Sequence, residues 1–160
     1  MPELNPYAKF LGGRSVEEIL SSTPGMIAAL FEKLGSEKVA VSPAPGKWSP
    51  AEIVCHLADC EVAFGFRLRQ TLAEPGHVLQ PFDQDKWAAP YAGISAADAL
   101  AAFEGLRRWN LVLLKWALPA HASDLVTHPE RGRMTFTTIV ETMAGHDRNH
   151  LAQLERITAA

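Results

Sequence analysis

The sequence predicts an all-α protein that folds as a four-helix bundle. Four long segments repeat apolar residues every three to four positions, the period of a helix packed on a core. Each segment begins at a serine or threonine, residues typical of helix N-caps. The segments are separated by two long connections, 74–94 and 119–134, and no part of the chain is a convincing strand. Amphipathic helices of this number and length bury their apolar faces by packing side by side.

The first two helices have clear start signals. Ser15-Val16-Glu17-Glu18 is a capping-box pattern that opens a helix ending near Gly35, with Thr23-Pro24 as a second start or kink inside it. Ser49-Pro50-Ala51-Glu52 opens the second helix, which should continue to about Ala73. The inward face of this second helix is predicted to carry Ile53, His56, Leu57, Cys60, Ala63 and Phe64, followed by Arg67 or Leu68.

The third and fourth helices follow the two long connections. The connection 74–94 is rich in acidic and aromatic residues, and connections of this length inside one domain are often functional. Ser95 should cap the third helix, which carries an apolar stripe to about Leu118-Pro119. Thr135 or Thr137 should cap the fourth helix, which runs to about Thr158.

Composition restricts the class of protein. Of 160 residues, 21% are charged and the net charge is −3, without the basic cluster that nucleic-acid binding requires. No apolar run reaches the roughly 20 residues that span a bilayer, and the N-terminus lacks the pattern of a signal peptide. We therefore expect a single cytoplasmic domain over residues 1–160, with 1–14 as an irregular arm, and neither a nucleic-acid nor a membrane partner. Three arginine pairs are predicted to be solvated surface charge: Arg67/Arg69, Arg107/Arg108 and Arg131/Arg133.

The two cysteines favour a reducing compartment. Cys55 and Cys60 lie five positions apart on one predicted helix, so their side chains should point in different directions. We expect no disulfide between them. Cys60 lies one turn from His56 and is interpreted as a small core residue rather than a thiol nucleophile.

Three of the six histidines fall on predicted core faces. His146 and His150 are four residues apart in the last helix, so they are neighbours on one face, and His56 lies on the inward face of the second helix. A single buried histidine is more often satisfied by a hydrogen bond, but one divalent cation would satisfy all three. Three neutral imidazoles with one open position are typical of a catalytic zinc site. The other histidines, His77, His121 and His128, lie in connections and carry no prediction.

Two other metal sites fit less well. His146-Asp147-Arg148-Asn149-His150 resembles the zinc-protease pattern H-E-x-x-H, but it has the shorter acid, and the segment after His150 is too short for a downstream third ligand. A di-iron bundle requires Glu-x-x-His on two helices, and that spacing is missing here.

Several motifs together resemble the DinB/YfiT-like superfamily. They are Lys47-Trp48-Ser49-Pro50, His56-Leu57-Ala58-Asp59-Cys60-Glu61, Asp83-Gln84-Asp85-Lys86-Trp87, and Gly145-His146-Asp147-Arg148-Asn149-His150 followed by Gln153. The resemblance spans roughly residues 15–158. It implies an up-down-down-up bundle, a divalent metal held by His56, His146 and His150, and a homodimer. Zinc or nickel is expected first, with iron, copper or manganese as other candidates.

The resemblance also implies a range of reactions. Similar proteins include thiol S-transferases that use low-molecular-weight thiols and metal-dependent hydrolases, so a small-molecule substrate, with a low-molecular-weight thiol as one candidate, is expected. Thiol transfer to a small electrophile is the leading hypothesis and hydrolysis its nearest variant. A non-catalytic metal-binding or small-molecule-binding stress protein, and a bundle without metal, are the alternatives.

The catalytic acids are the least determined part of the prediction. Candidates for acid–base or ligand-orienting roles are Asp59, Glu61, Asp83, Asp85 and Asp147, although for each of them surface charge is the preferred interpretation. Asp85, which lies beside Trp87 in the long connection and would be laid over the metal, and Asp59 are selected as catalytic candidates.

Overall fold

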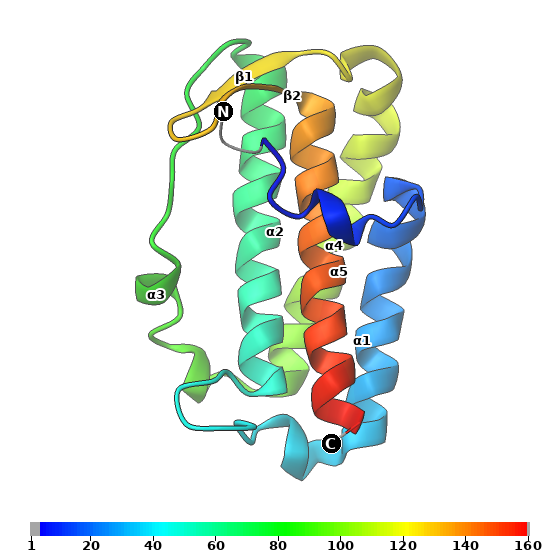
Figure 1. The fold of residues 1–160 in the computed structure, drawn as a ribbon, viewed down its shortest axis with the longest axis vertical. Coiled ribbons are helices and arrows are strands. Elements are labelled where there is room, and N and C mark those ends of the chain that lie inside the picture. Colours follow the sequence, from blue (N-terminus) through cyan, green and yellow to red (C-terminus); the bar gives the residue numbers. More distant parts are fainter. Residues whose placement is uncertain (1–3, 160) are drawn as a thin grey trace.

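The computed structural model describes residues 4–159, and within them four long helices lie side by side (Figure 1). These helices are α1 (Val16–Val39), α2 (Pro50–Ala73), α4 (Ala96–His121) and α5 (Phe136–Ala159). Three short helical elements lie between or before them within residues 4–159: η1 (Ala8–Phe10), α3 (Gln84–Trp87) and η2 (Tyr91–Gly93). The predicted all-α four-helix bundle is confirmed. No helix within residues 4–159 combines the length and the apolar character that crossing a membrane requires.

The predicted helix starts are present as hydrogen bonds. The Ser15 hydroxyl accepts from the backbone N–H of Glu18 at 3.1 Å. Ser49 and Glu52 form a complete capping box, since each side chain accepts from the backbone N–H of the other. Thr135 Oγ1 accepts from the backbone N–H of Thr138 at 3.1 Å and so caps α5. These bonds satisfy backbone donors that the first turn of a helix leaves unpaired.

Helix α1 differs slightly from its prediction. It continues through Pro24 without a restart, and Gly35 interrupts it with φ 78° and ψ 159° before a final turn ends at Val39. A residue with a side chain rarely adopts this positive φ, so glycine sets the position of the break.

The bundle has the up-down-down-up order that the resemblance implied. In Figure 1, α1 and α5 run downward, whereas α2 and α4 both run upward. Helix α2 packs mainly against α4, and α1 packs mainly against α5. Because α2 and α4 are parallel, the chain must return along the bundle between them. A helix of 24 residues is about 36 Å long, so this return requires at least about ten extended residues. The parallel arrangement therefore explains the length of the connection after α2.

The expectation of no strands was wrong. Residues Leu125–His128 (β1) and Gly132–Thr135 (β2) form an antiparallel hairpin at one end of the bundle (Figure 1). The connection after α2 extends this pairing, because Leu79 N–H donates to the Thr127 carbonyl at 2.8 Å and Thr127 N–H donates to the His77 carbonyl at 2.9 Å. Each strand has four residues, too few for an alternating pattern to be recognised in the sequence.

Candidate metal centre

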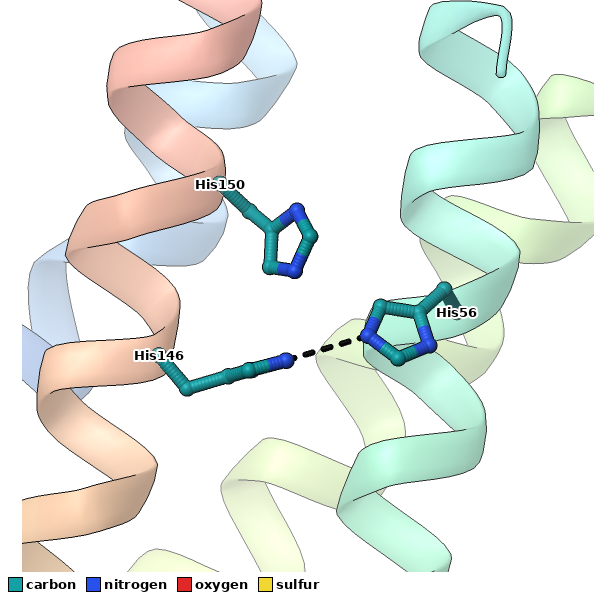
Figure 2. A group of neighbouring side chains, drawn as sticks. All are labelled: His56, His146 and His150. Carbon is teal, nitrogen blue, oxygen red and sulfur yellow. Dashed lines mark hydrogen bonds between the residues drawn. The ribbon is translucent and has the colours of Figure 1, made fainter. Parts of the chain in front are cut away.

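The three histidines selected by helical spacing come together inside the bundle. His56 projects from α2, and His146 and His150 project from α5 toward it (Figure 2). One ring nitrogen from each histidine lies within 4.8 Å of the other two. The Nε2 atoms of His56 and His146 are 3.0 Å apart. Two nitrogens that each lie about 2.0–2.1 Å from a shared zinc ion are roughly 3–3.5 Å apart, so this pair has the spacing of two ligands.

The imidazoles are held in the neutral form that binds metals. Burial, and then the charge of His150, lowers the pKa of His56 to about 4. Burial lowers the pKa of His146 well below its usual value, and the neighbouring His150, His56 and Arg107 lower it further. The pKa of His150 is also lowered by burial, although its bond to Gln153 opposes the shift. At neutral pH each ring therefore keeps a lone pair for a cation.

Gln153 determines which nitrogen of His150 is free to bind a metal. Its amide oxygen Oε1 lies 3.1 Å from His150 Nδ1. An amide oxygen only accepts hydrogen bonds, so Nδ1 carries the proton and Nε2 is left unprotonated. With three neutral imidazoles and one orienting amide, the residues present fit a divalent cation.

Aromatic side chains hold the other two rings. The Trp48 ring centroid lies 5.1 Å from that of His56. Tyr7 meets His146 edge to face at 5.2 Å, and Phe64 lies 6.2 Å from the same ring. These contacts restrict the rotation of both imidazoles and exclude water from one side of the cluster.

The N-terminal arm lies directly on α5 at this point. A Cβ atom at Gly145 would lie 2.5 Å from the Tyr7 carbonyl oxygen and 2.7 Å from Tyr7 Cβ. No side chain fits in that space, so glycine is required next to His146 for the arm to reach the site. The sequence predicted an irregular arm over residues 1–14, but it did not predict that Tyr7 of this arm touches a metal-ligand candidate.

A cavity of about 240 Å³ opens beside His56 and His146. Five segments form its wall: the arm, α2, the connection after α2, the β1–β2 hairpin and α5. Its other polar or ionisable side chains are Tyr7, Cys60, Arg67, Gln84, His128, Glu130, Arg131 and Thr142. His56 and His146 therefore border a space that a small molecule can enter.

Three of these wall residues correct the sequence interpretation. Arg67 and Arg131 are partly buried in the wall rather than simply solvated, and His128 is buried there although it carried no prediction. Helical spacing offered a signal for Arg67, which lies near the end of the same α2 stripe as His56. His128 and Arg131 belong to the hairpin, for which the sequence offered no signal.

Cys60 lies beside the histidines and stays a protonated thiol. Its Sγ atom is 3.5 Å from His56 Nε2 and 3.9 Å from His146 Nε2. Burial raises the pKa of this thiol far above its usual value, and nearby carboxylates, Glu61 first, raise it further. Because the thiolate is the nucleophilic form, Cys60 is not poised as a nucleophile.

A buried ionic network lies next to the cluster, where the sequence interpretation placed surface charge. The Arg107 side chain is 1% exposed, donates to Glu61 Oε1 at 2.6 Å, and forms two bonds to Asp147 at 2.6 and 3.0 Å. Asn110 completes the network by donating to Glu61 Oε2 at 3.0 Å. The surface interpretation of Arg107, Glu61 and Asp147 was therefore wrong. Each charge is tolerated inside the bundle because it is paired.

The structure does not bring Asp59 or Asp85 to the cavity. Asp59 Oδ2 accepts a 2.6 Å hydrogen bond from the Tyr91 hydroxyl, so it anchors the connection before α4. Asp85 is exposed on α3, and neither acid is part of the cavity wall. The placement of Asp85 over the metal is not seen, and the catalytic roles of both acids stay predictions.

Comparison with known proteins identifies relatives that match most of the chain. A "Putative metal-dependent hydrolase" of Oceanobacillus iheyensis is 25% identical over 136 residues, which cover 84% of this chain and 79% of that protein. A protein of the same description from Bacillus cereus (strain 03BB102) is 23% identical over 159 residues, covering 93% and 91% of the two chains.

The solved structure of YfiT from Bacillus subtilis shares the fold. It superposes with a TM-score of 0.81 at 18% identity, over 90% of this chain and 84% of that one. YfiT is described as "a probable metal-dependent hydrolase with an unusual four-helix bundle topology". The family model of the DinB superfamily matches residues 19–154, most of the chain. This protein therefore belongs to the DinB superfamily.

Proposed function

We propose that this protein is a metal-dependent hydrolase of small molecules, with its metal held by His56, His146 and His150. The observation that carries the proposal is the convergence of three neutral imidazoles at the edge of a cavity. The names of the relatives in Oceanobacillus and Bacillus support hydrolysis. Zinc or nickel is the proposed metal, because imidazole ligands suit both.

The metal would supply a Lewis acid and lower the pKa of water that binds it. The protein's own residues orient the ligands and the substrate. Gln153 fixes the tautomer of His150, while Tyr7 and Phe64 shield His146 from water. Burial raises the pKa of Tyr7, so its hydroxyl stays protonated at neutral pH and can donate to a substrate oxygen. Glu130 supplies the carboxylate of the cavity wall and is the proposed proton acceptor.

Thiol transfer is the second candidate function. The two arginines of the cavity wall favour it, because common low-molecular-weight thiols carry carboxylates that guanidinium groups bind. The predicted homodimer remains a separate prediction, which light scattering of the purified chain tests.

Metal content and turnover test the proposal together. Protein purified without a histidine tag should bind one divalent ion per chain, and His150→Ala should lose it. His121→Ala is the matched control, because His121 lies at the end of α4 and pairs with Asp124 instead. The metal-loaded protein should hydrolyse members of a panel of esters, amides and phosphoesters. Removing partners outside the ligand set of a metal site typically costs 10–100-fold, so His150→Ala should cost at least about 100-fold.

The other experimental outcomes would each support a different function. Turnover only with a thiol and an electrophile would establish thiol transfer and reject hydrolysis. Tight metal binding without any turnover would favour the non-catalytic binding protein. Absence of metal, with unchanged metal content in His150→Ala, would reject the metal site itself.

A further inference from the structure

We infer that the cavity beside the histidines recognises its ligand through a carboxylate, and that Arg67 and Arg131 receive this group. The inference names a substrate class for the proposed hydrolase and rests on that function for its catalytic meaning. Binding of the carboxylate itself can be measured without turnover.

Arg67 reaches the cavity from the helix that carries His56. Its Nη2 atom donates to the Gln80 carbonyl at 3.1 Å, and its guanidinium carbon lies 5.7 Å from the centre of the Phe82 ring. These two contacts hold the head group at the cavity wall. A guanidinium has five N–H donors, so most of its donors have no partner among the described residues.

Arg131 approaches the same space from the hairpin. It lies in the turn between β1 and β2 and contributes to the cavity wall. Arg67, Arg131 and His128 all line this one cavity. Burial, and then the positive charge of Arg131, lowers the pKa of His128, so this histidine is neutral and adds no charge.

Neither arginine forms an ion pair with a carboxylate within residues 4–159. Arg107 shows the opposite arrangement, since it is enclosed by Glu61 and Asp147 at 2.6 Å. The fully buried Arg107 is therefore neutralised, whereas Arg67 and Arg131 line a cavity without a carboxylate partner. Keeping two like charges together without such partners is costly, and a bound anion would remove the cost.

Charge and volume limit what the anion can be. In the metal-free protein, two guanidinium groups and the exposed carboxylate of Glu130 leave the ionisable wall side chains with one net positive charge, which matches a carboxylate better than a doubly charged phosphate. The cavity of about 240 Å³ is smaller than the roughly 300–1,000 Å³ of pockets for drug-sized ligands. We therefore expect a small organic acid or a small molecule with one carboxylate.

Benzoate and benzamide provide a direct test, because they share a shape and differ in charge. Isothermal titration of the full chain, metal-loaded and metal-free, should show benzoate binding roughly 10- to 100-fold more tightly than benzamide. The preference should persist without metal, where the histidines cannot bind a carboxylate through an ion. Equal binding of the two probes to the wild-type protein, or tighter binding of inorganic phosphate than of benzoate, would overturn the inference.

Variants assign the preference to the two arginines. Arg67→Gln combined with Arg131→Gln should abolish the preference, whereas Arg133→Gln, at an exposed arginine of β2 outside the cavity, should retain it. A double variant that keeps the preference would also overturn the inference. Metal content distinguishes failure of the carboxylate site from failure of the proposed hydrolase. The double variant should bind metal as the wild type does. A wild-type chain that binds no metal would reject the hydrolase but not the carboxylate site.

Discussion

Replacing Gly145 with alanine should displace the N-terminal arm from the metal centre. The new Cβ atom would lie 2.5 Å from the carbonyl oxygen and 2.7 Å from the Cβ atom of Tyr7. Real Cβ contacts are not this short, and the obstructing oxygen belongs to the backbone. A change of side-chain rotamer therefore cannot relieve the clash, and Tyr7 must move away from α5 together with its packing on His146.

Two opposing effects determine the change in stability. Exchanging glycine for alanine inside a helix stabilises it by about 0.8–1.0 kcal/mol. Overpacking a close contact costs about 1–3 kcal/mol. Gly145→Ala should therefore lie between about no change and 2 kcal/mol of destabilisation. Gly105→Ala in α4 is the matched control, because nothing lies within 4 Å of its new Cβ atom, and it should show the stabilisation alone.

Urea unfolding and limited proteolysis measure the two consequences. The free energies of unfolding of the two variants should differ by about 1–3 kcal/mol, which is the cost of the clash. Trypsin should cut faster after Lys9 or Arg14 in Gly145→Ala than in Gly105→Ala, since both sites lie in or next to the arm. Equal stability and equal cleavage of the two variants would refute the close packing of the arm.

Two further predictions concern the buried charges and the histidines. Arg107→Met should lower the free energy of unfolding by about 3–5 kcal/mol, because Glu61 and Asp147 would stay buried without their cation. The control Arg108→Met, at the exposed neighbouring arginine, should change it by no more than about 0.5 kcal/mol. Equal urea midpoints of the two variants would contradict this prediction. In the metal-free protein, stability should fall as pH drops from about 6.5 toward about 4, because an unfolded histidine takes up its proton near 6.5, while the pKa of folded His56 is lowered to about 4. The urea midpoint should depend less steeply on pH in His56→Gln than in the wild type, with His146 and His150 keeping part of the dependence. An unchanged slope would argue against a neutral buried His56.

Local rules were sufficient to predict the helices and the histidine cluster. The capping hydrogen bonds of Ser15 and Ser49 involve residues within one turn, so a short stretch of sequence specifies them. His146 and His150 share a helix face by spacing alone, and His56 follows once the inward face of α2 is known. Spacing places the three histidines together once α2 and α5 face each other.

The buried ionic network could not be predicted in this way. The sequence assigned Arg107 of α4 to solvent. In the structure Asn110 and Arg107 are buried, whereas Trp109 is 62% exposed. An arginine is buried only where carboxylates meet it, and those of Glu61 and Asp147 come from two other helices. A pairing across three helices leaves no signal in the spacing of any one of them.

Arg107 also explains why the two histidine-bearing helices keep their alignment. From α4 its guanidinium donates to Glu61, which follows His56 on α2, and to Asp147, which follows His146 on α5. Sliding one helix by a single residue would move it by about 1.5 Å, so these 2.6 Å bonds would have to lengthen or bend. The same shift would separate the Nε2 atoms of His56 and His146. The charges that the sequence placed on the surface therefore fix the alignment of α2 and α5 on which the metal centre depends.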